Sequence, residues 1–463
     1  MNIFTTKTRF LAQMASFLCV AGLLASCTSK PSGPVDNVVL IIVDTLAARH
    51  LGVYGAANSP SPNIDSFARS STVFEKAYSP SSWTKPAVAS IFTGVMPSVH
   101  DVRSIDIDLN EDHPTLATRL KNIKIQSAGF ISHTFISPEM GYGQGFDRYE
   151  TLPFRGNVHD VVSSKKITDL GIDWLKENVT TSKKPFFLFL HYFDPHNNYQ
   201  HHESFDRSSW YNGEIKPGMD IRDIRNRIPE MNDDDIKYIR DLYDEEIAFT
   251  DEQIGRFLKF LKDMNLSDRT LVVLTADHGE EFLNHGAIGH SRTLYDELIH
   301  VPLIVRLPAK GQARRVEANV TTLDILPTVM DLFGIDKDPQ LQGVSLKETL
   351  IDSNATPPAR DIISEVDFRS RFIKSNKIAA IRGDYKLVLD KPTSTFELFN
   401  LKSDPREIEN IVSVDTVRVA EMGKVITDYK DKYQQNDEAL FKRKKKIEST
   451  PEEVEQLESL GYL

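Results

Sequence analysis

The sequence predicts an α/β fold, in which helices sandwich a large mixed sheet and a smaller C-terminal subdomain carries an antiparallel sheet. Continuous apolar, β-branched runs such as residues 37–43 are typical of strands that are buried on both faces. Helical patterns such as residues 241–261 separate these runs, and this alternation implies a parallel or mixed sheet covered on both sides. Near the C-terminus, a Gly-Asp turn instead joins two strand-like segments as a hairpin.

The expected strands of the large sheet share an apolar, β-branched composition. They are residues 37–43, 125–132, 185–193, 270–276 and 301–307. In sheets of this kind, ligands bind at the carboxyl ends of the strands. The polar residues that come after each run are therefore the candidate site residues.

The C-terminal subdomain is predicted from the hairpin at residues 379–390 and from the strand-like segment that begins at residue 395. The chain then ends in a charged, helical tail. The basic run at residues 442–446 is interpreted as a solvated face, because the acidic segment 451–458 comes after it.

The net charge of -11 argues against a nucleic-acid partner, whose binding depends on Lys and Arg neutralising phosphates. The chain has two cysteines, Cys19 and Cys27, and both lie near the N-terminus. Disulfides are therefore not expected to hold the folded body together.

The first 26 residues are interpreted as a signal peptide, because Lys7 and Arg9 precede an apolar stretch. Its end, residues 24–27, resembles the lipobox of bacterial lipoproteins, in which Cys27 would be acylated and would anchor the chain in a membrane. Residues 27–35 form a short tether. Thr28 follows the cysteine in place of the aspartate of inner-membrane lipoproteins, so the expected location is the bacterial cell envelope, at the outer membrane and facing the periplasm.

Two strand ends carry the residues of a possible metal site. Asp44 follows the run 37–43, and Asp277 and His278 follow the run 270–276. Carboxylate and imidazole ligands together favour a divalent ion such as Mn or Zn over Ca, which prefers all-oxygen sites. Alternatively, such a carboxylate caps a helix or belongs to a loop.

Thr84 can be interpreted in two ways. It precedes Lys85 and Pro86, and proline is favoured in the first turn of a helix, so Thr84 could cap that helix. Its hydroxyl could also be a nucleophile, activated by a metal ion at the positive helix end. The two roles are compatible.

Several blocks together resemble the sulfatase family of the alkaline phosphatase superfamily, in the family's order. They are residues 38–55, 61–78, 270–282, 293–308, 320–335, 381–388, 396–411 and 457–463. The resemblance implies the sulfatase fold, with a catalytic domain at residues 36–360, a C-terminal subdomain at 361–435 and a tail at 436–463. It also implies a metal-dependent hydrolase of sulfate, phosphate or phosphonate esters.

The nucleophile block departs from the family pattern C-x-P-S-R-A-x-L-L-T-G. Thr84 stands at the place of the Cys or Ser that becomes formylglycine, and Ala87 and Val88 replace the Ser and Arg. Asp44 is followed by Thr45, so the family's acidic pair is half present. A threonine intermediate has no second hydroxyl for elimination, so it must be broken by attack at sulfur or phosphorus. Thr84 then resembles the nucleophile of phosphoryl-transferring relatives, on a metal held by Asp44, Thr84, Asp277 and His278.

Further site residues are expected from the family's order. His196 and His290 are the catalytic candidates beside Thr84, and Lys85, Asp194 and Arg292 are candidates for binding an anionic substrate. His290 could instead bind a second metal with Asp194 and His196. His133 and His191 are weaker candidates.

The favoured function is hydrolysis of a small-molecule, glycan or lipid ester at the cell envelope. The first alternative is a phosphoethanolamine-type or phosphoglycerol-type transferase. Such enzymes usually carry several membrane spans, and here only a lipid anchor is expected. The second alternative is a non-catalytic lipoprotein that binds a glycan or a partner.

Overall fold

The computed structural model describes residues 35–152, 163–182, 184–308, 313–369 and 374–434. All the described residues belong to one compact unit, Pro34–Leu463. The predicted signal peptide, Cys27, nearly all of the tether and the tail at 436–463 lie outside the described residues, so those predictions stay predictions.

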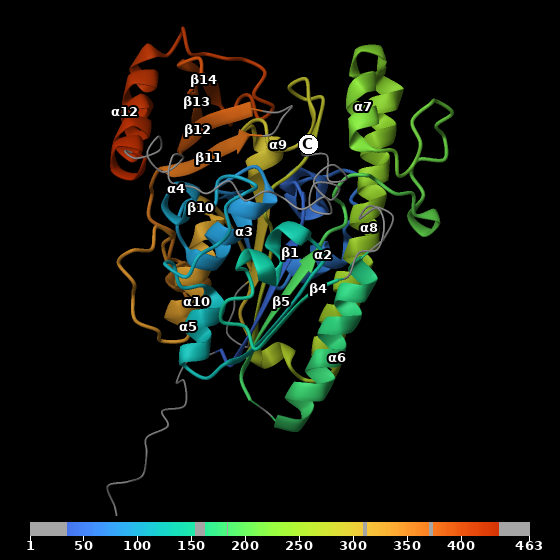
Figure 1. The fold of residues 1–463 in the computed structure, drawn as a ribbon, viewed down its shortest axis with the longest axis vertical. Coiled ribbons are helices and arrows are strands. Elements are labelled where there is room, and N and C mark those ends of the chain that lie inside the picture. Colours follow the sequence, from blue (N-terminus) through green and yellow to red (C-terminus); the bar gives the residue numbers. More distant parts are fainter. Residues whose placement is uncertain (1–34, 153–162, 183, 309–312, 370–373, 435–463) are drawn as a thin grey trace, which may run out of the picture. The chain divides into compact units, whose positions relative to one another are not determined.

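An eight-stranded mixed sheet forms the centre of this unit, with the strand order β10-β2-β9-β6-β1-β5-β3-β4 (Figure 1). Strand β9 runs antiparallel to both β2 and β6, whereas β1 is parallel to β5 and β6. The expected mixed sheet is confirmed. Its strands are β1 (Asn37–Val43), β2 (Thr72–Tyr78), β3 (Gln126–Ile131), β4 (Arg148–Thr151), β5 (Phe186–Tyr192), β6 (Thr270–Ala276), β9 (His300–Arg306) and β10 (Arg314–Thr321).

Helices cover both faces of this sheet (Figure 1). Val39, Ile41 and Val43 of β1 pack in one core with the long helices α6 and α8, and the alternate residues of β1 pack in a second core with α3, α5 and α10. Both faces of the central strands are therefore buried, as their continuous apolar sequences predict. The helices of the unit are α2 (Pro62–Ala68), α3 (Thr84–Thr93), α4 (Pro97–His100), α5 (Leu116–Asn122), α6 (Ser164–Ser182), α7 (Ile221–Arg227), α8 (Asp233–Asp263), α9 (Asp296–Ile299), α10 (Ile325–Leu332), α11 (Lys347–Ile351) and α12 (Thr416–Tyr433).

Helix α8 begins eight residues earlier than the pattern at 241–261 predicts. Asn232 and Asp235 form a capping box there, and acidic residues fill the first turn, where they complement the positive helix end. These first two turns are mostly polar and show little apolar periodicity, so the sequence pattern places the start of the helix too late.

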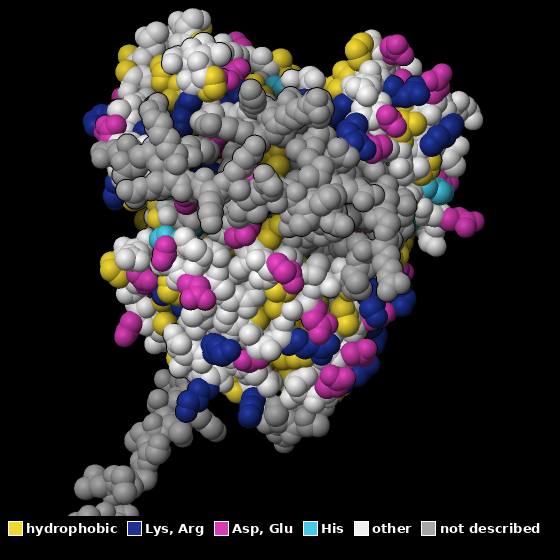
Figure 2. Space-filling view, viewed as in Figure 1, with side chains coloured by type: hydrophobic (Ala, Val, Ile, Leu, Met, Phe, Trp, Pro, Cys, Tyr) yellow, Lys and Arg dark blue, Asp and Glu magenta, His cyan; other side chains and the backbone are white. Residues whose placement is uncertain are grey.

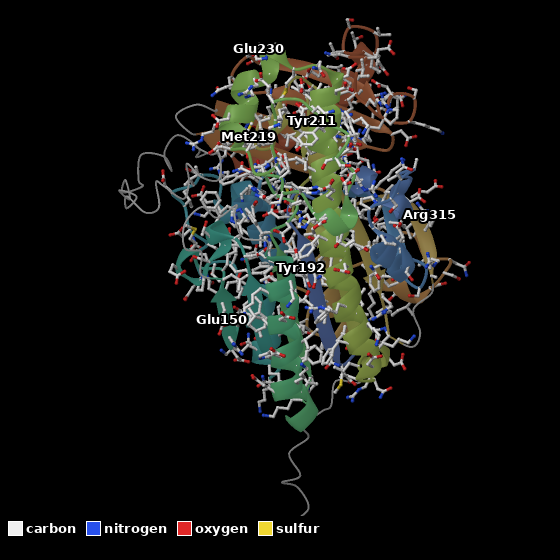
Figure 3. All side chains as sticks on the ribbon, turned by 90° about the vertical axis from the view of Figure 1, so that its right-hand side faces the viewer. Glu150, Tyr192, Tyr211, Met219, Glu230 and Arg315 are labelled. Carbon is white, nitrogen blue, oxygen red and sulfur yellow. The ribbon has the colours of Figure 1, made fainter. Side chains whose placement is uncertain are left out.

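Helices α6 and α8 are seen from the side in Figure 3. Tyr192 of β5 bonds to Thr168 of α6, with a hydroxyl–hydroxyl distance of 2.9 Å.

The C-terminal subdomain is a four-stranded antiparallel sheet in the order β11-β12-β13-β14, with α12 packed against it. The strands are β11 (Ile362–Arg369), β12 (Lys374–Arg382), β13 (Tyr385–Asp390) and β14 (Thr395–Asn400). The predicted hairpin joins β12 to β13 through Gly383 and Asp384, where the glycine has a φ of 59°. Both sheets belong to one compact unit, so the boundary at residue 360 stays a prediction.

A buried lysine joins the two sheets. Lys386 of β13 has no exposed side-chain surface, and its Nζ lies 2.7 Å from Oδ1 of Asp296 and 2.6 Å from Oε1 of Glu407. Asp296 opens α9, just before β9 of the large sheet. The C-terminal sheet is thus attached to the large sheet through a buried charge cluster.

The visible surface mixes both signs of charge. Lys and Arg side chains alternate with Asp and Glu over the described part of the face in Figure 2. Among the described residues, none of the helices combines the length and the apolar character that a membrane crossing requires.

Candidate active site

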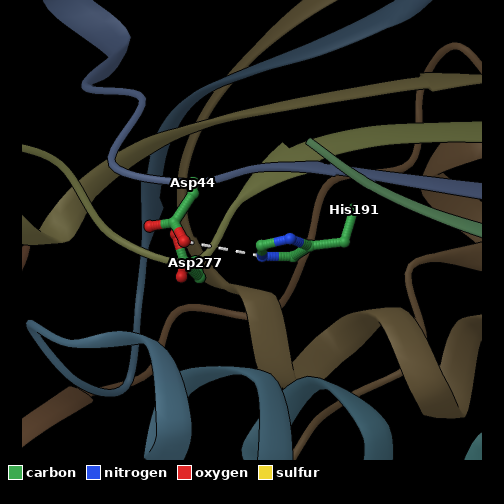
Figure 4. A group of neighbouring side chains, drawn as sticks. All are labelled: Asp44, His191 and Asp277. Atoms are coloured by element: carbon green, nitrogen blue, oxygen red, sulfur yellow. Dashed lines mark ion pairs between the residues drawn. The ribbon is translucent and has the colours of Figure 1, made fainter. Parts of the chain in front are cut away.

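The candidate site lies where three neighbouring strands end. Asp44 directly follows β1, Asp277 directly follows β6, and His191 is the penultimate residue of β5. The parallel register aligns these ends, because Ile42 pairs with His191 and Val43 pairs with Ala276. All three side chains are fully buried and face one another (Figure 4).

Thr84 is the first residue of α3, which begins beside these strand ends. The N-cap is Trp83, and it makes no side-chain capping bond. The hydroxyl Oγ1 of Thr84 lies 3.2 Å from Nε2 of His278. Ala87 and Val88, which stand where the family has Ser and Arg, are buried, and Val88 belongs to the apolar core. The structure therefore directs Thr84 to the strand end of β6, and capping α3 is not its role.

The carboxyl groups of Asp44 and Asp277 are incompletely bonded within the described protein. Oδ1 of Asp277 accepts the backbone N–H groups of His278 at 2.8 Å and Thr45 at 3.2 Å. Oδ2 of Asp277 and both oxygens of Asp44 are buried without a hydrogen-bond partner among the described residues. Burial, together with the nearby Asp277 and Glu280, raises the pKa of Asp44 well above its usual value. A bound cation is the usual way to make such buried carboxylates tolerable, so these residues fit a metal ion.

His278 is held in one tautomer by its own loop. Its Nδ1 lies 2.9 Å from the carbonyl oxygen of Gly279, and a carbonyl only accepts, so the ring proton is on Nδ1. Nε2 is then the accepting nitrogen that meets the Thr84 hydroxyl, and it lies 3.7 Å from Oδ1 of Asp44 and 3.6 Å from Oδ2 of Asp277. The structure thus brings together the four predicted ligands, Asp44, Thr84, Asp277 and His278.

Two further histidines reach the same carboxylate. Nε2 of His191 and Nε2 of His133 each lie 3.7 Å from Oδ2 of Asp44, and both rings are fully buried. Burial lowers the pKa of His191 to about 4 and lowers the pKa of His133 well below its usual value. The sequence predicts both only as weaker candidates. The rule that sites form at the carboxyl ends of strands could have found them, since His133 follows β3 and His191 ends β5.

His196 and His290 line the other side of this group. The ring of His290 lies 4.5 Å from the ring of His278 and 5.0 Å from that of His196, measured between centroids. Nδ1 of His290 lies 3.0 Å from Oε1 of Glu280, a buried carboxylate that the sequence reasoning missed. Burial raises the pKa of Glu280 to about 7, and burial together with His278 lowers the pKa of His290. A neutral His290 thus points its proton at Glu280 and keeps a lone pair on Nε2.

Of the three predicted substrate-binding residues, Lys85 and Asp194 are already bonded to protein groups, whereas Arg292 lies near the histidines. The Nζ of Lys85 donates to the carbonyl of Ile105 at 2.6 Å and to Asp108 at 3.0 Å, so a substrate would have to compete for this ammonium. Arg292 stays close to the histidines, because its charge contributes to lowering the pKa of His290.

Asp194 is bonded to the start of α6. Its Oδ2 accepts the backbone N–H groups of Ser163 at 3.1 Å and Ser164 at 2.8 Å, and the hydroxyl of Ser164 at 2.6 Å. Asp194 therefore caps the start of α6, because unpaired N–H groups at a helix start attract carboxylates. Its Oδ2 is thus occupied by protein donors, whereas Oδ1 has a single long contact of 3.4 Å with the N–H of Ser163, so a second metal shared with His196 stays a prediction.

Comparison with known proteins identifies relatives along most of the chain. A family model described as Sulfatase matches residues 36–335, and one described as N-sulphoglucosamine sulphohydrolase, C-terminal, matches residues 284–436. The Delta 4,5-hexuronate-2-O-sulfatase of Bacteroides thetaiotaomicron is 26% identical over 430 residues, covering 85% of this chain and 87% of that protein.

Solved structures share the fold at lower identity. A protein bound to its substrate D-glucosamine-2-N,6-O-disulfate superimposes with a TM-score of 0.73 at 21% identity, covering 87% of this chain and 99% of the other. The phosphonate monoester hydrolase of Agrobacterium radiobacter superimposes with a TM-score of 0.70 at 21% identity, covering 85% and 95% of the two chains. The expected architecture of a large mixed sheet with a small C-terminal sheet is confirmed.

Proposed function

Because the chain belongs to the sulfatase family, and is thus a hydrolase of sulfate or phosphate esters, we propose that Thr84 is its nucleophile. The observation that carries this proposal is the distance of 3.2 Å between Oγ1 of Thr84 and Nε2 of His278, at buried strand ends. Asp44, Asp277 and His278 would hold a divalent cation, with Mn or Zn favoured over Ca. Bound there, the cation would polarise the Thr84 hydroxyl and offset the negative charge of the transferring group.

The reaction has two covalent steps. Oγ1 of Thr84 attacks the phosphorus or sulfur, the bond to the ester oxygen breaks, and the alcohol leaves with the proton that Thr84 gives up. Water then attacks the same atom, the bond to Oγ1 breaks, and Thr84 regains a proton. This is nucleophilic catalysis through an ester of threonine.

His290 is suited to the second step as a general base. Its Nε2 lone pair can accept a proton from the attacking water, and Glu280 stabilises the imidazolium that forms. This differs from the expected role of His290 as a proton donor, because its ring proton is committed to Glu280. His133 has the opposite arrangement: its Nδ1 accepts the N–H of Phe135 at 3.0 Å, so a neutral His133 presents a proton on Nε2.

We propose a phosphate or phosphonate ester as the substrate, in preference to a sulfate ester. A threonine ester must be opened by attack at the transferred atom, and this route is shared with phosphoryl-transferring enzymes. The similarity of fold to a phosphonate monoester hydrolase supports this choice, and the glycan sulfatase relative supports a saccharide as the alcohol. Measuring the turnover of each ester distinguishes a phosphate or phosphonate substrate from a sulfate substrate.

The test measures metal content and then assays aryl sulfate, phosphate monoester, phosphate diester and phosphonate in parallel. Wild type is compared with Thr84→Ala and Asp277→Asn. Loss of activity in both variants, with metal retained in Thr84→Ala, supports the proposal. Full activity in Thr84→Ala would exclude Thr84 as the nucleophile, and acceleration by added alcohol acceptors would favour a transferase.

The envelope location is a proposal that rests on the sequence around Cys27. We propose a lipid anchor on Cys27 and an outer-membrane position facing the periplasm. Incorporation of labelled palmitate into the full chain, and its loss in Cys27→Ala, would support the anchor. Equal labelling of both would contradict it.

A further inference from the structure

We propose that His191 is a ligand of the active-site metal, so that the site has two nitrogen donors beside its two carboxylates. The proposal rests on the proposed function in that it uses the same cation. It adds a residue to the metal site and leaves the role of Thr84 untouched. The family's residue order predicted Asp44, Thr84, Asp277 and His278 as ligands, without His191.

The side chain of His191 is buried, and neither of its ring nitrogens forms a hydrogen bond within the described protein. Its exposed surface is 0%. Buried polar atoms are nearly always bonded, so an imidazole left in this way calls for a partner that is not a protein group. One ligand atom from each of Asp44, His191 and Asp277 lies within 4.8 Å of the others, a spacing that one cation can bridge.

The strand explains how the histidine reaches this position. Alternate residues of β5 point to the same face, and Phe187 and Phe189 pack in the core beneath α3. His191 is the next residue in this row, with its ring 6.3 Å from that of Phe189. An aromatic ring would continue this core without leaving polar atoms unpaired. The sequence instead places an imidazole there, beside two carboxylates.

His133 is the natural comparison, because its Nε2 is also 3.7 Å from Oδ2 of Asp44. Its Nδ1 already accepts the backbone N–H of Phe135, so the proton of the neutral ring sits on Nε2. A protonated nitrogen donates a hydrogen bond and cannot bind a metal. His191 has no such restraint on either nitrogen, so the geometry distinguishes two histidines at equal distance.

A second imidazole has a consequence for metal choice. Ca²⁺ takes oxygen ligands almost exclusively, whereas Mn²⁺ and Zn²⁺ accept imidazole. A site with both His191 and His278 should therefore prefer Zn²⁺ or Mn²⁺. Removing His191 should lower the affinity for these ions more than the affinity for Ca²⁺.

The test uses the purified full chain, stripped with a chelator and reloaded with Mn²⁺ for electron spin-echo measurements of nitrogen coupling. Wild type should show two coupled imidazole nitrogens. His191→Gln should show one, and His133→Gln, the matched control, should keep two. In titrations, His191→Gln should bind Zn²⁺ at least about tenfold more weakly, as loss of a residue that supports a metal site does, while Ca²⁺ binding stays within about twofold.

The number of nitrogens coupled to Mn²⁺ in wild type tests the proposal by itself, even if His191→Gln folds poorly. One nitrogen in wild type, or an equal loss in His191→Gln and His133→Gln, would overturn the assignment. Thr84→Ala separates the two proposals, because it should keep two nitrogens whatever happens to ester hydrolysis. A protein that binds metal through two nitrogens but hydrolyses no ester would contradict the proposed function alone.

Discussion

Oγ1 of Thr84 and Nε2 of His278 lie 3.2 Å apart although the two residues are 194 positions apart in the chain. The contact joins the first residue of α3 to the end of β6. This contact makes the hydroxyl group of Thr84, rather than the size of its side chain, the property to test. Thr84→Val keeps the shape of the side chain and removes the hydroxyl, whereas Thr84→Ser keeps the hydroxyl and removes the methyl group.

Thr84→Val should lower kcat/KM for the best ester substrate by about a thousandfold or more, as loss of a nucleophile does. Thr84→Ser should retain activity within about a hundredfold, since a hydroxyl stays in place. Thermal unfolding should hardly change in either, because Thr84 does not cap α3. Equal activities of the Val and Ser variants would contradict a role for the hydroxyl.

Glu280→Gln should lower kcat by about a hundredfold, because the amide cannot stabilise a charged imidazolium at His290. Glu281→Gln is the matched control. Its Oε1 accepts the backbone N–H groups of His285 and Ala287, and an amide oxygen can do the same. Steady-state kinetics of both variants check this. Equal losses at the two positions would show a general effect of the loop.

Asp194→Asn should act on stability and leave substrate binding nearly intact. The carboxylate caps α6, and weakening such a cap costs about 1 kcal/mol. We expect a lower urea midpoint and a KM within about threefold of wild type, measured on the full chain. An increase in KM of about tenfold or more, without loss of stability, would restore the substrate-binding role first expected for Asp194.

Lys386→Met should destabilise the protein by about 3 kcal/mol or more, because it leaves the carboxylates of Asp296 and Glu407 without their buried cation. Lys377→Met, in the neighbouring strand, breaks a partly exposed pair with Asp390 and should cost about 1 kcal/mol or less. Urea unfolding of the two variants measures the difference. Similar costs would mean that burial of Lys386 adds nothing to its ion pairs.

The protein should lose stability on acidification through His100, which is fully buried. Burial lowers the pKa of His100 to about 3, and His113 and Arg103 act in the same direction. Below about pH 6.5 the unfolded chain takes up a proton at His100 whereas the folded protein does not, so stability falls as pH falls. The loss is about 2 kcal/mol between pH 6.5 and pH 5, and it continues down to the folded pKa.

His100→Gln removes this contribution, so its urea midpoint should decline less steeply with acidification than that of wild type. Nε2 of His100 is bonded to Ser90 at 2.9 Å, and a glutamine can occupy part of this space. The comparison is made between pH 7.5 and pH 5, and the difference in slope is the measured quantity. Parallel pH profiles would show that His100 is protonated in the folded state.

The fold, and the positions of four predicted ligands at the strand ends, were predictable because they follow local rules. Asp44 and the pair Asp277 and His278 directly follow apolar runs, and Thr84 stands in a recognisable block before a proline. Ligand sites in such sheets form at the carboxyl ends of the strands, so these residues can be chosen before the order of the strands is known. The helix α8 was found as well, apart from its polar first turns.

The sequence does not show that His191 and His133 meet Asp44, or that Glu280 meets His290, because these contacts depend on sheet order and on side-chain direction. His191 lies within an apolar run, and only the pairing of β1 with β5 shows that it meets Asp44. Lys85 and Asp194 show the opposite case. Both are close to predicted site residues in the sequence. In the structure, however, the ammonium of Lys85 is bonded to Ile105 and Asp108, and the carboxylate of Asp194 is bonded to the start of α6.

Thr84, the proposed nucleophile, would be complete as soon as the chain is translated. The Cβ of threonine carries a methyl group, so oxidation there would give a ketone and not the aldehyde of formylglycine. The chain should therefore need no maturation enzyme. Production in a host that lacks such an enzyme should yield fully active protein, and its activity should appear at the rate of folding and metal loading.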